Sequence, residues 1–269
     1  MLVVEGDAEN ILLPVIARLL DRDLHEYGVS IVNVGGVGLG RYARIFMRKD
    51  SERDGILDIP VACVTDLDVM PDMAPWIVGK LEEGEQIPKR PPSKRKWCIK
   101  ADFPGDELEQ RRKARREKAS GQRVETFVAD EWTLEYDLAF HGLGEFVWRA
   151  AVLAIKDDQL HSGKVEMADV IAAADADFQT LVAENFDKPT FASHVYAKFE
   201  VDGASKAIAA QYLAELLEKQ KEEQEKEGTF DVGSLRRQLP PYLVAAIAFV
   251  TSPFETTEQP QPAQVAAEK

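Results

Sequence analysis

The chain contains 269 residues, of which 45% are hydrophobic, 8% are aromatic and 30% are charged. This composition is that of a globular protein with a sizeable core, and the length allows one large domain or two smaller ones. The longest uninterrupted apolar stretch, residues 243–250, is far shorter than the roughly 20 residues that cross a bilayer. We therefore expect no membrane span. Because three of the first ten residues are acidic, where a secretory signal would have a basic and then an apolar region, we expect a cytoplasmic protein.

The charge of the chain is unevenly distributed. The sequence contains 33 basic and 47 acidic residues, a net charge of −14, which argues against a nucleic-acid partner. Residues 89–118, here called the basic arm, nevertheless contain twelve Lys or Arg against five Asp or Glu. The rest of the chain is therefore even more acidic than the average indicates.

The first 70 residues alternate between short apolar runs and helical patterns. A strand is expected at residues 2–4, followed by a helix that begins after Asp7 as its N-cap and continues to about Leu24. A second apolar run at residues 29–34 ends in a glycine-rich turn and is followed by a helix at 41–49. The third run, residues 59–64, is continuously apolar. Such a strand is typical of a parallel sheet covered on both faces, so we predict an α/β fold.

The remaining sequence is mostly helical in pattern. We expect a helix at 107–119, a fourth strand at 124–128, and then alanine-rich helices at 131–155, 165–184 and 190–199 and from Lys206 onward. This shift in composition predicts a helical insertion or subdomain attached to a mainly parallel sheet. The expected boundaries are an α/β core at 1–140, a helical subdomain at 141–204, helices returning to the core at 205–252, and a disordered tail at 253–269.

Several common kinds of site are excluded by the motifs that the sequence lacks. The four histidines form no HxH or HExxH pattern and no CxxC occurs, so zinc chemistry is disfavoured and both cysteines are expected to be structural thiols. The run 35–40 (GGVGLG) follows a predicted strand, but it departs from the GxGxxG dinucleotide fingerprint because Arg41 stands in place of the third glycine.

Acidic residues follow the first and third predicted strands. Glu5 ends the first strand, and Glu9 lies one helical turn further on. Asp66 and Asp68 follow the third strand. The carboxyl ends of parallel strands meet at one edge of the sheet, where carboxylates repel one another unless a cation such as Mg²⁺ compensates. The pattern predicts a site for a hard divalent metal, whereas each residue taken alone also fits a helix-dipole or solvated loop position.

Four segments together resemble a known family. They are residues 3–20 (VVEGDAENILLPVIARLL), 32–38 (VNVGGVG), 59–68 (IPVACVTDLD) and 133–139 (TLEYDLA). The VEGxxE and DxD pair is typical of Toprim domains, which also occur in topoisomerases and primases. The VNVGG and TLEYDL segments indicate the Toprim domain of the OLD (overcoming lysogenization defect) nucleases in particular. The resemblance implies a Toprim core with helices on both faces of the sheet.

The resemblance also implies an activity and a set of site residues. The activity is a DNA endonuclease that uses two divalent ions, Mg²⁺ or Mn²⁺, with Ca²⁺ as a non-catalytic substitute. The implied metal ligands are Glu5, Glu9, Asp66, Asp68 and Glu135. Thr133 stands where the family carries a small hydroxyl residue, and Lys206 stands where a lysine lies near the metals. Lys164 and Lys198 are alternatives to Lys206.

Full-length OLD proteins join this domain to an amino-terminal ATPase of the ABC type. The present sequence contains no GxxxxGK[ST] motif, so we expect no ATP site in it. It also begins four residues before the first implied catalytic glutamate. We therefore expect it to be the carboxyl-terminal nuclease half of such a protein, with the ATPase as its partner; the sequence does not define an oligomeric state.

Two other functions compete with the nuclease. The string VACVTDLDV fits a haloacid-dehalogenase phosphatase, in which Asp66 would be the nucleophile and Asp68 the acid and base. That interpretation leaves the VEGDAE segment unexplained. A non-catalytic Toprim scaffold in DNA repair is the second alternative, and the presence of all five acidic positions counts against it because mutually repelling carboxylates need a compensating role.

The basic arm is the expected DNA-binding surface of the nuclease, because an acidic metal centre cannot attract DNA alone. The alternative is a solvated surface with no partner. The residues expected to contact phosphates are Lys94, Arg95, Lys96, Arg111, Arg112, Lys113, Arg115 and Arg116.

Overall fold

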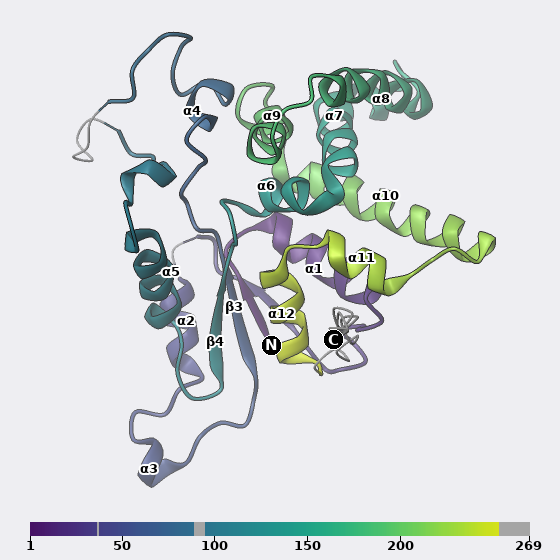
Figure 1. Ribbon diagram of the computed structural model, residues 1–269. Helices are drawn as coiled ribbons and strands as arrows, with labels where there is room; N and C mark the ends of the chain where they lie inside the picture. The colour runs from purple at the N-terminus through teal and green to yellow at the C-terminus, as the bar shows by residue number, and fades with distance from the viewer. Residues whose placement is uncertain (37, 89–94, 253–269) are drawn as a thin grey trace, which may run out of the picture.

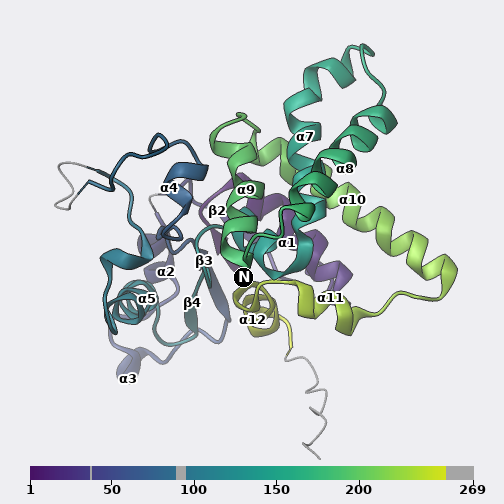
Figure 2. The ribbon, with the colours of Figure 1, turned by 45° about the horizontal axis from the view of Figure 1, so that its top comes forward.

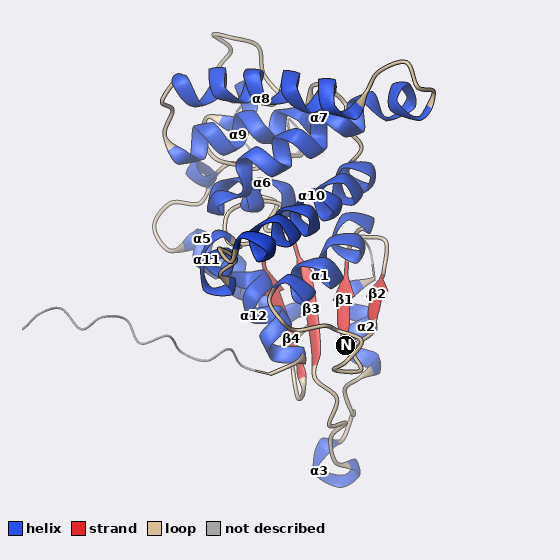
Figure 3. Ribbon diagram, turned by 90° about the vertical axis from the view of Figure 1, so that its right-hand side faces the viewer, coloured by secondary structure: helices blue, strands red, loops and turns tan. Residues whose placement is uncertain are grey.

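A computed structural model of the protein describes residues 1–36, 38–88 and 95–252. Within these ranges the sheet has four strands, namely β1 (Leu2–Val4), β2 (Ile31–Asn33), β3 (Val61–Thr65) and β4 (Val124–Val128). All neighbouring strands are parallel and lie in the order β2-β1-β3-β4. Figure 1 shows β3 beside β4, and Figure 3 labels all four strands. The predicted α/β fold with a parallel sheet is confirmed.

Strand β3 is buried along its whole length. All five of its residues are buried, which explains why its sequence is continuously apolar instead of alternating. Leu2 of β1 is paired with Ala62 of β3, and Val61 is paired with Val124 of β4. This register brings the carboxyl ends of β1 and β3 to the same edge of the sheet.

Helices cover both faces of the sheet, as Figure 2 shows. On one side lie α1 (Asp7–Leu19), α10 (Lys206–Glu227) and α12 (Pro241–Val250), and on the other lie α2 (Leu39–Ile45) and α5 (Glu107–Lys118). The residues of β3 alternate between the two sides. Ala62 and Val64 belong to the large apolar core under α1 and α12, whereas Val61 and Cys63 belong to a smaller core under α2.

A layer of helices lies beyond the carboxyl ends of the strands (Figure 3). It contains α6 (Leu134–Leu138), a π-helical turn (Ala139–Leu143), α7 (Gly144–His161), α8 (Met167–Ala183) and α9 (Lys188–Glu200). Helix α11 (Val232–Gln238) precedes α12, and the short elements are α3 (Ser51–Asp54), α4 (Ala74–Ile77) and a 3-10 turn (Lys100–Asp102). Because α10 packs against both α1 and α7, it connects this layer to the sheet.

Some predicted boundaries were wrong. Helix α1 ends at Leu19 instead of Leu24, since the chain reverses at Asp21 with a positive φ of 55°. Its N-cap is Gly6, and Asp7 is its first residue. The helix expected at 131–155 is interrupted at Gly142, where φ is 139°. A Cβ there would lie 3.3 Å from the Cβ of Gln238, so glycine also permits the close approach of α11.

The helical run Leu134–His161 is long and apolar enough to cross a membrane by length and composition, with a mean hydropathy of 1.3. Over half of its most apolar window, 56%, is buried inside the protein. This burial and the interruption at Gly142 are typical of a core helix. The predicted disordered tail, residues 253–269, lies outside the described residues.

Candidate functional site

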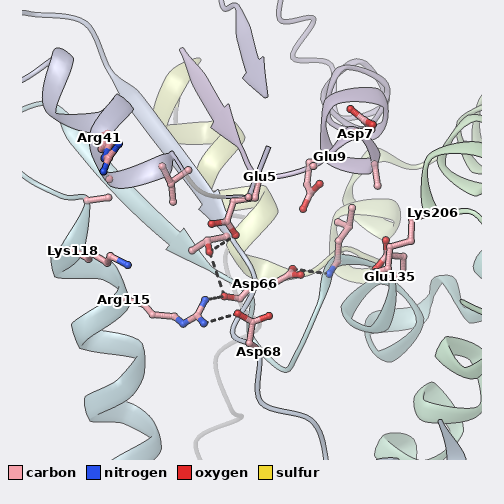
Figure 4. A pocket seen from close by; sticks show the side chains of 18 of the residues that line it. Glu5, Asp7, Glu9, Arg41, Asp66, Asp68, Arg115, Lys118, Glu135 and Lys206 are labelled. Atoms are coloured by element: carbon pink, nitrogen blue, oxygen red, sulfur yellow. Dashed lines mark hydrogen bonds and ion pairs between the residues drawn. The ribbon is translucent and has the colours of Figure 1, made fainter. Parts of the chain in front are cut away.

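A cavity of about 910 Å³ opens at the carboxyl ends of β1 and β3. Its lining includes all five carboxylates that the sequence analysis singled out and the predicted lysine, namely Glu5, Glu9, Asp66, Asp68, Glu135 and Lys206 (Figure 4). These residues come from four separate parts of the chain: the end of β1 with the start of α1, the segment after β3, helix α6, and helix α10. The fold therefore brings the predicted acidic residues to one place.

The turn between β1 and α1 positions the first two carboxylates. Glu5 accepts a hydrogen bond of 2.7 Å from the hydroxyl of Thr65, the last residue of β3. A Cβ added at Gly6 would lie only 2.8 Å from Oε2 of Glu9, so any larger residue there would displace the Glu9 carboxylate. The glycine of the VEGxxE motif thus leaves the space that this carboxylate occupies.

Glu9 is an unusually buried carboxylate. Its residue is 8% exposed, and it forms no ion pair with any described residue. Burial, together with the nearby charges of Glu135 and Glu5, raises the pKa of Glu9 to about 6. A bound cation would relieve both causes, because it would neutralise the carboxylate and replace the water that burial removes.

Asp66 is held by the loop that follows β4. The backbone N–H of Leu134 donates a hydrogen bond of 3.1 Å to Oδ1 of Asp66. The carbonyl oxygen of Trp132 accepts from the N–H of Leu67, at 2.9 Å, and fixes the segment after β3. Burial and the charges of Glu9 and Glu135 raise the pKa of Asp66 well above its usual range.

Asp68 lies nearer the mouth of the cavity and has a basic partner. Nη2 of Arg115, on α5, donates to Oδ2 of Asp68 at 2.6 Å, and Nη1 of the same guanidinium donates to the carbonyl oxygen of Asp66. The Asp68 side chain is 60% exposed. Arg115 therefore belongs to the cavity wall, and it ties α5 to the acidic segment after β3.

Glu135 and Lys206 form the opposite side of the cavity. Nζ of Lys206 donates to Oε2 of Glu135 at 2.9 Å and lies 5.1 Å from the ring centre of Tyr196. Burial alone would lower the pKa of Lys206, but the charges of Glu135 and Asp66 outweigh it, so this pKa is raised and the ammonium stays charged. Lys206 starts α10, whose N-cap is Ser205.

The hydroxyl residue and the two alternative lysines that the sequence analysis named do not line the cavity. Thr133 is the N-cap of α6, where its hydroxyl accepts a long hydrogen bond of 3.5 Å from the N–H of Tyr136; it does not line the cavity. Its position orients the helix that carries Glu135. Of the alternative lysines, Lys198 is paired with Asp202 at 2.8 Å and Lys164 lines a separate groove beside α8.

The five carboxylates are ligands suited to a hard divalent cation, but their oxygen atoms do not converge on a single point. No three carboxylate, imidazole or thiolate side chains in the described part of the chain are close enough to hold one ion. The hydrogen bonds and ion pairs given above explain this, since Thr65, Arg115 and Lys206 each hold one carboxylate apart from the others.

Several of the described cations of the predicted basic arm have an acidic neighbour. Arg112 and Arg116 both lie within 3.6 Å of Glu109, and Lys113 lies 3.8 Å from Glu117. Arg95 is buried and paired with Asp102. Arg111 lies 5.1 Å from the ring centre of Phe103, Lys96 is exposed, and Lys94 lies outside the described residues. Of the eight predicted DNA contacts, Arg115 is the one that lines the cavity.

Three basic residues of the cavity wall were not among the predicted site residues. Arg41 and Arg44 lie on α2, and Lys118 is the last residue of α5. Arg41 carried a signal, because it interrupts the glycine fingerprint. Asn33 was also missed: its amide donates to Asp7 at 2.7 Å and accepts from the N–H of Gly35, which organises the turn between β2 and α2.

Asp137 is a second buried acidic residue of α6, and it does not belong to the cavity. It is fully buried, and its carboxylate accepts hydrogen bonds from the backbone N–H groups of Glu131, at 3.1 Å, and Trp132, at 2.9 Å. Asp137 thereby fixes the loop whose carbonyl oxygen at Trp132 holds Leu67. It is a positioning residue for the site.

Comparison with known proteins places the amino-terminal part of the chain. Residues 1–68 match the family described as overcoming lysogenization defect protein-like, TOPRIM domain. The C-terminal region of the Xanthomonas campestris pv. campestris OLD protein superposes with a TM-score of 0.47 and 18% identity, covering 93% of this chain and 90% of that chain. The C-terminal region of the Burkholderia pseudomallei OLD protein superposes with a TM-score of 0.45 and 23% identity, covering 93% of this chain and 94% of that chain. None of the curated protein sequences matches the chain.

Proposed function

We propose that the chain is a metal-dependent DNA endonuclease that hydrolyses phosphodiester bonds, since residues 1–68 match the OLD-like TOPRIM family. The observation that carries the proposal is the convergence of five carboxylates from three parts of the chain on one cavity, next to a charged lysine. Glu9 and Asp66 have no ion-pair partner among the described residues, and a raised pKa, which both carboxylates have, is expected where carboxylates lie together without a cation.

The proposed ligands are Glu5, Glu9, Asp66, Asp68 and Glu135. Two divalent ions bound there, Mg²⁺ or Mn²⁺, would polarise the scissile phosphate and lower the pKa of an attacking water. The protein orients these carboxylates through the hydroxyl of Thr65 and the backbone N–H of Leu134. Lys206 supplies a point charge that stabilises the negative charge developing on the phosphate.

The same proposal includes a partner domain. The two similar structures are C-terminal regions of OLD proteins. We propose that an amino-terminal ATPase of the ABC type accompanies this chain in the full-length protein and that any ATP dependence belongs to that domain. A haloacid-dehalogenase phosphatase is less well supported, because it would use Asp66 and Asp68 but give no role to the carboxylates of Glu5, Glu9 and Glu135 in the same cavity.

The test is incubation of the chain with supercoiled plasmid in Mg²⁺, in Mn²⁺, in Ca²⁺ and in EDTA. We expect cleavage with Mg²⁺ or Mn²⁺ and none with EDTA or Ca²⁺. Asp66→Asn should abolish cleavage. Asp158→Asn is the matched control, because Asp158 is exposed on α7 and removing its charge leaves the cavity intact.

Other outcomes identify the alternatives. Hydrolysis of p-nitrophenyl phosphate without plasmid cleavage would indicate a phosphatase. DNA binding without cleavage in either metal would indicate a scaffold. If the Asp66→Asn variant cleaved as well as the wild type, the activity would not arise from this cavity.

A further inference from the structure

The wall of the cavity formed by α2 and α5 carries three basic side chains that the proposed chemistry does not use. Arg41 and Arg44 come from α2, and Lys118 comes from the end of α5. The two helices touch here, since a Cβ added at Gly40 would lie 3.4 Å from the carbonyl oxygen of Lys118. This contact brings three positive charges from distant parts of the sequence to one wall, called here the cationic wall.

These three cations differ from the others on the same face of the molecule. All three are exposed, and none forms an ion pair with a described residue. By contrast, the neighbouring Arg112, Lys113 and Arg116 of α5 are each within 4 Å of a glutamate. In a chain with a net charge of −14, side chains that remain without a carboxylate partner are available to an external anion.

The position of the cationic wall relative to the carboxylates defines the shape of that anion. In Figure 4, Arg41 and Lys118 lie on one side of Glu5 and Asp66, whereas Lys206 lies on the other. The acidic centre thus lies between two positive positions. A polymer with repeated negative charges can contact both positions at once.

The lining also indicates which part of a nucleic acid is contacted. No aromatic side chain is among the cavity-lining residues of the described chain, so bases have no stacking platform there. Guanidinium groups match phosphate oxygens in a bidentate geometry, and backbone contacts carry no sequence information. The wall is therefore suited to the sugar-phosphate backbone.

We propose that Arg41, Arg44 and Lys118 form a phosphate-binding subsite that holds the backbone of the substrate strand beside the scissile bond. This inference rests on the proposed nuclease function, which it deepens by naming the part of the substrate that is bound. The subsite binds without sequence preference and offsets the repulsion between DNA and the acidic centre. The outer face of α5, whose charges are paired within the helix, contributes less to binding.

The experiment measures binding of a short fluorescein-labelled single-stranded oligonucleotide by anisotropy, in Ca²⁺ and at several salt concentrations. The test variant is Arg41→Gln/Arg44→Gln/Lys118→Gln. The control is Lys164→Gln/Lys219→Gln/Lys226→Gln, which removes the same charge from exposed lysines away from the cavity. Circular dichroism checks that both variants fold.

We expect the test variant to bind at least tenfold more weakly. The slope of log binding constant against log salt concentration should become shallower by about 2, since each phosphate contact on a single strand contributes about 0.7 to it. The control should bind like the wild type. Arg41→Lys/Arg44→Lys, which keeps both charges, should retain most of the affinity. A loss in this variant as large as in the test variant would contradict a role for these charges.

Three other outcomes would overturn the subsite: equal weakening in the test variant and the control, unchanged affinity and slope in the test variant, or no binding by the wild type. Plasmid cleavage separates this proposal from the proposed function. If the test variant lost binding but the wild type cleaved nothing, the subsite would stand and the nuclease would fall. If the wild type cleaved and the test variant bound normally, the nuclease would stand and the subsite would fall.

Discussion

The cavity and the loop at the start of α6 both contain carboxylates that are withdrawn from solvent, but they compensate for that burial differently. In the loop, Asp137 is fully buried and accepts hydrogen bonds from two backbone N–H groups. In the cavity, Glu9 is almost as buried, yet it has no ion-pair partner among the described residues and it lies near the charges of Glu135 and Glu5.

This difference shows what distinguishes a functional carboxylate from a structural one. Burial is common to both regions, and so is a raised pKa, since burial also raises the pKa of Asp137 to about 7. The kind of partner differs. Two backbone N–H groups hold Asp137 in place inside the protein, whereas Glu9 lines an open cavity beside the charges of Glu5 and Glu135, where a cation can reach it.

The largest expected effect is the loss of cleavage activity when a cavity carboxylate is replaced. Replacing Glu9 with Gln should reduce plasmid cleavage on the order of 10³-fold or more, because a catalytic metal contributes several kcal/mol to transition-state stabilisation. The free energy of unfolding of the metal-free variant should not fall, because the change removes a buried charge that repels its neighbours. Cleavage rates and urea unfolding measure the two quantities. A variant that loses stability in parallel with activity would make Glu9 a structural residue.

The second prediction concerns Asp137 and the free energy of unfolding. Asp137→Ala should lower the free energy of unfolding by about 3 kcal/mol, because two buried backbone N–H groups lose their acceptor and each unsatisfied group costs about 1–3 kcal/mol. Urea denaturation monitored by tryptophan fluorescence measures it. Asp158→Ala, on the exposed face of α7, should change stability by less than about 0.5 kcal/mol. Equal effects of the two substitutions would remove the structural role of Asp137.

The third prediction tests how closely the fold positions one cavity carboxylate. In Gly6→Ala, the added Cβ would lie only 2.8 Å from Oε2 of Glu9. The flexible carboxylate can move aside at little cost in stability. Mn²⁺ affinity should fall about tenfold, the lower end of what a misplaced ligand environment costs. Calorimetric titration measures this affinity. Unchanged affinity would show that the glycine serves the turn alone.

The smallest expected effect concerns the ion pair at the mouth of the cavity. Arg115→Gln frees Asp68 from its basic partner, and Mn²⁺ affinity should rise by at most about fivefold, because a pair this exposed is worth about 1 kcal/mol or less. The same titration detects the change. Lower affinity in this variant would mean that Arg115 holds Asp68 in its binding position instead of competing with the metal.

The sequence allowed some parts of the site to be predicted and not others. Glu5, Glu9, Asp66 and Asp68 could be predicted because each pair lies within a few residues of a strand end, where local pattern and topology agree. Glu135 lies far along the chain, so the family resemblance alone identified it. That resemblance is confirmed over residues 1–68.

The cationic wall could not be predicted, because it depends on the tertiary contact between α2 and α5. The basic arm shows the limit of a charge count. The count gave a local excess of basic residues, but it did not show that Glu109 and Glu117, at helical spacing from Arg112 and Lys113, form pairs with them. The number of charges along the sequence therefore does not tell which of these cations are available to a polyanion.

Calorimetric titration of the metal-free chain with Mn²⁺ shows whether the acidic cavity is a site for divalent cations. The wild type should bind one or two ions, and Glu9→Gln/Asp66→Asn should bind none, while Asp158→Asn should bind as the wild type does. A wild type that binds no Mn²⁺, or a double variant that binds it with unchanged affinity and stoichiometry, would contradict the account.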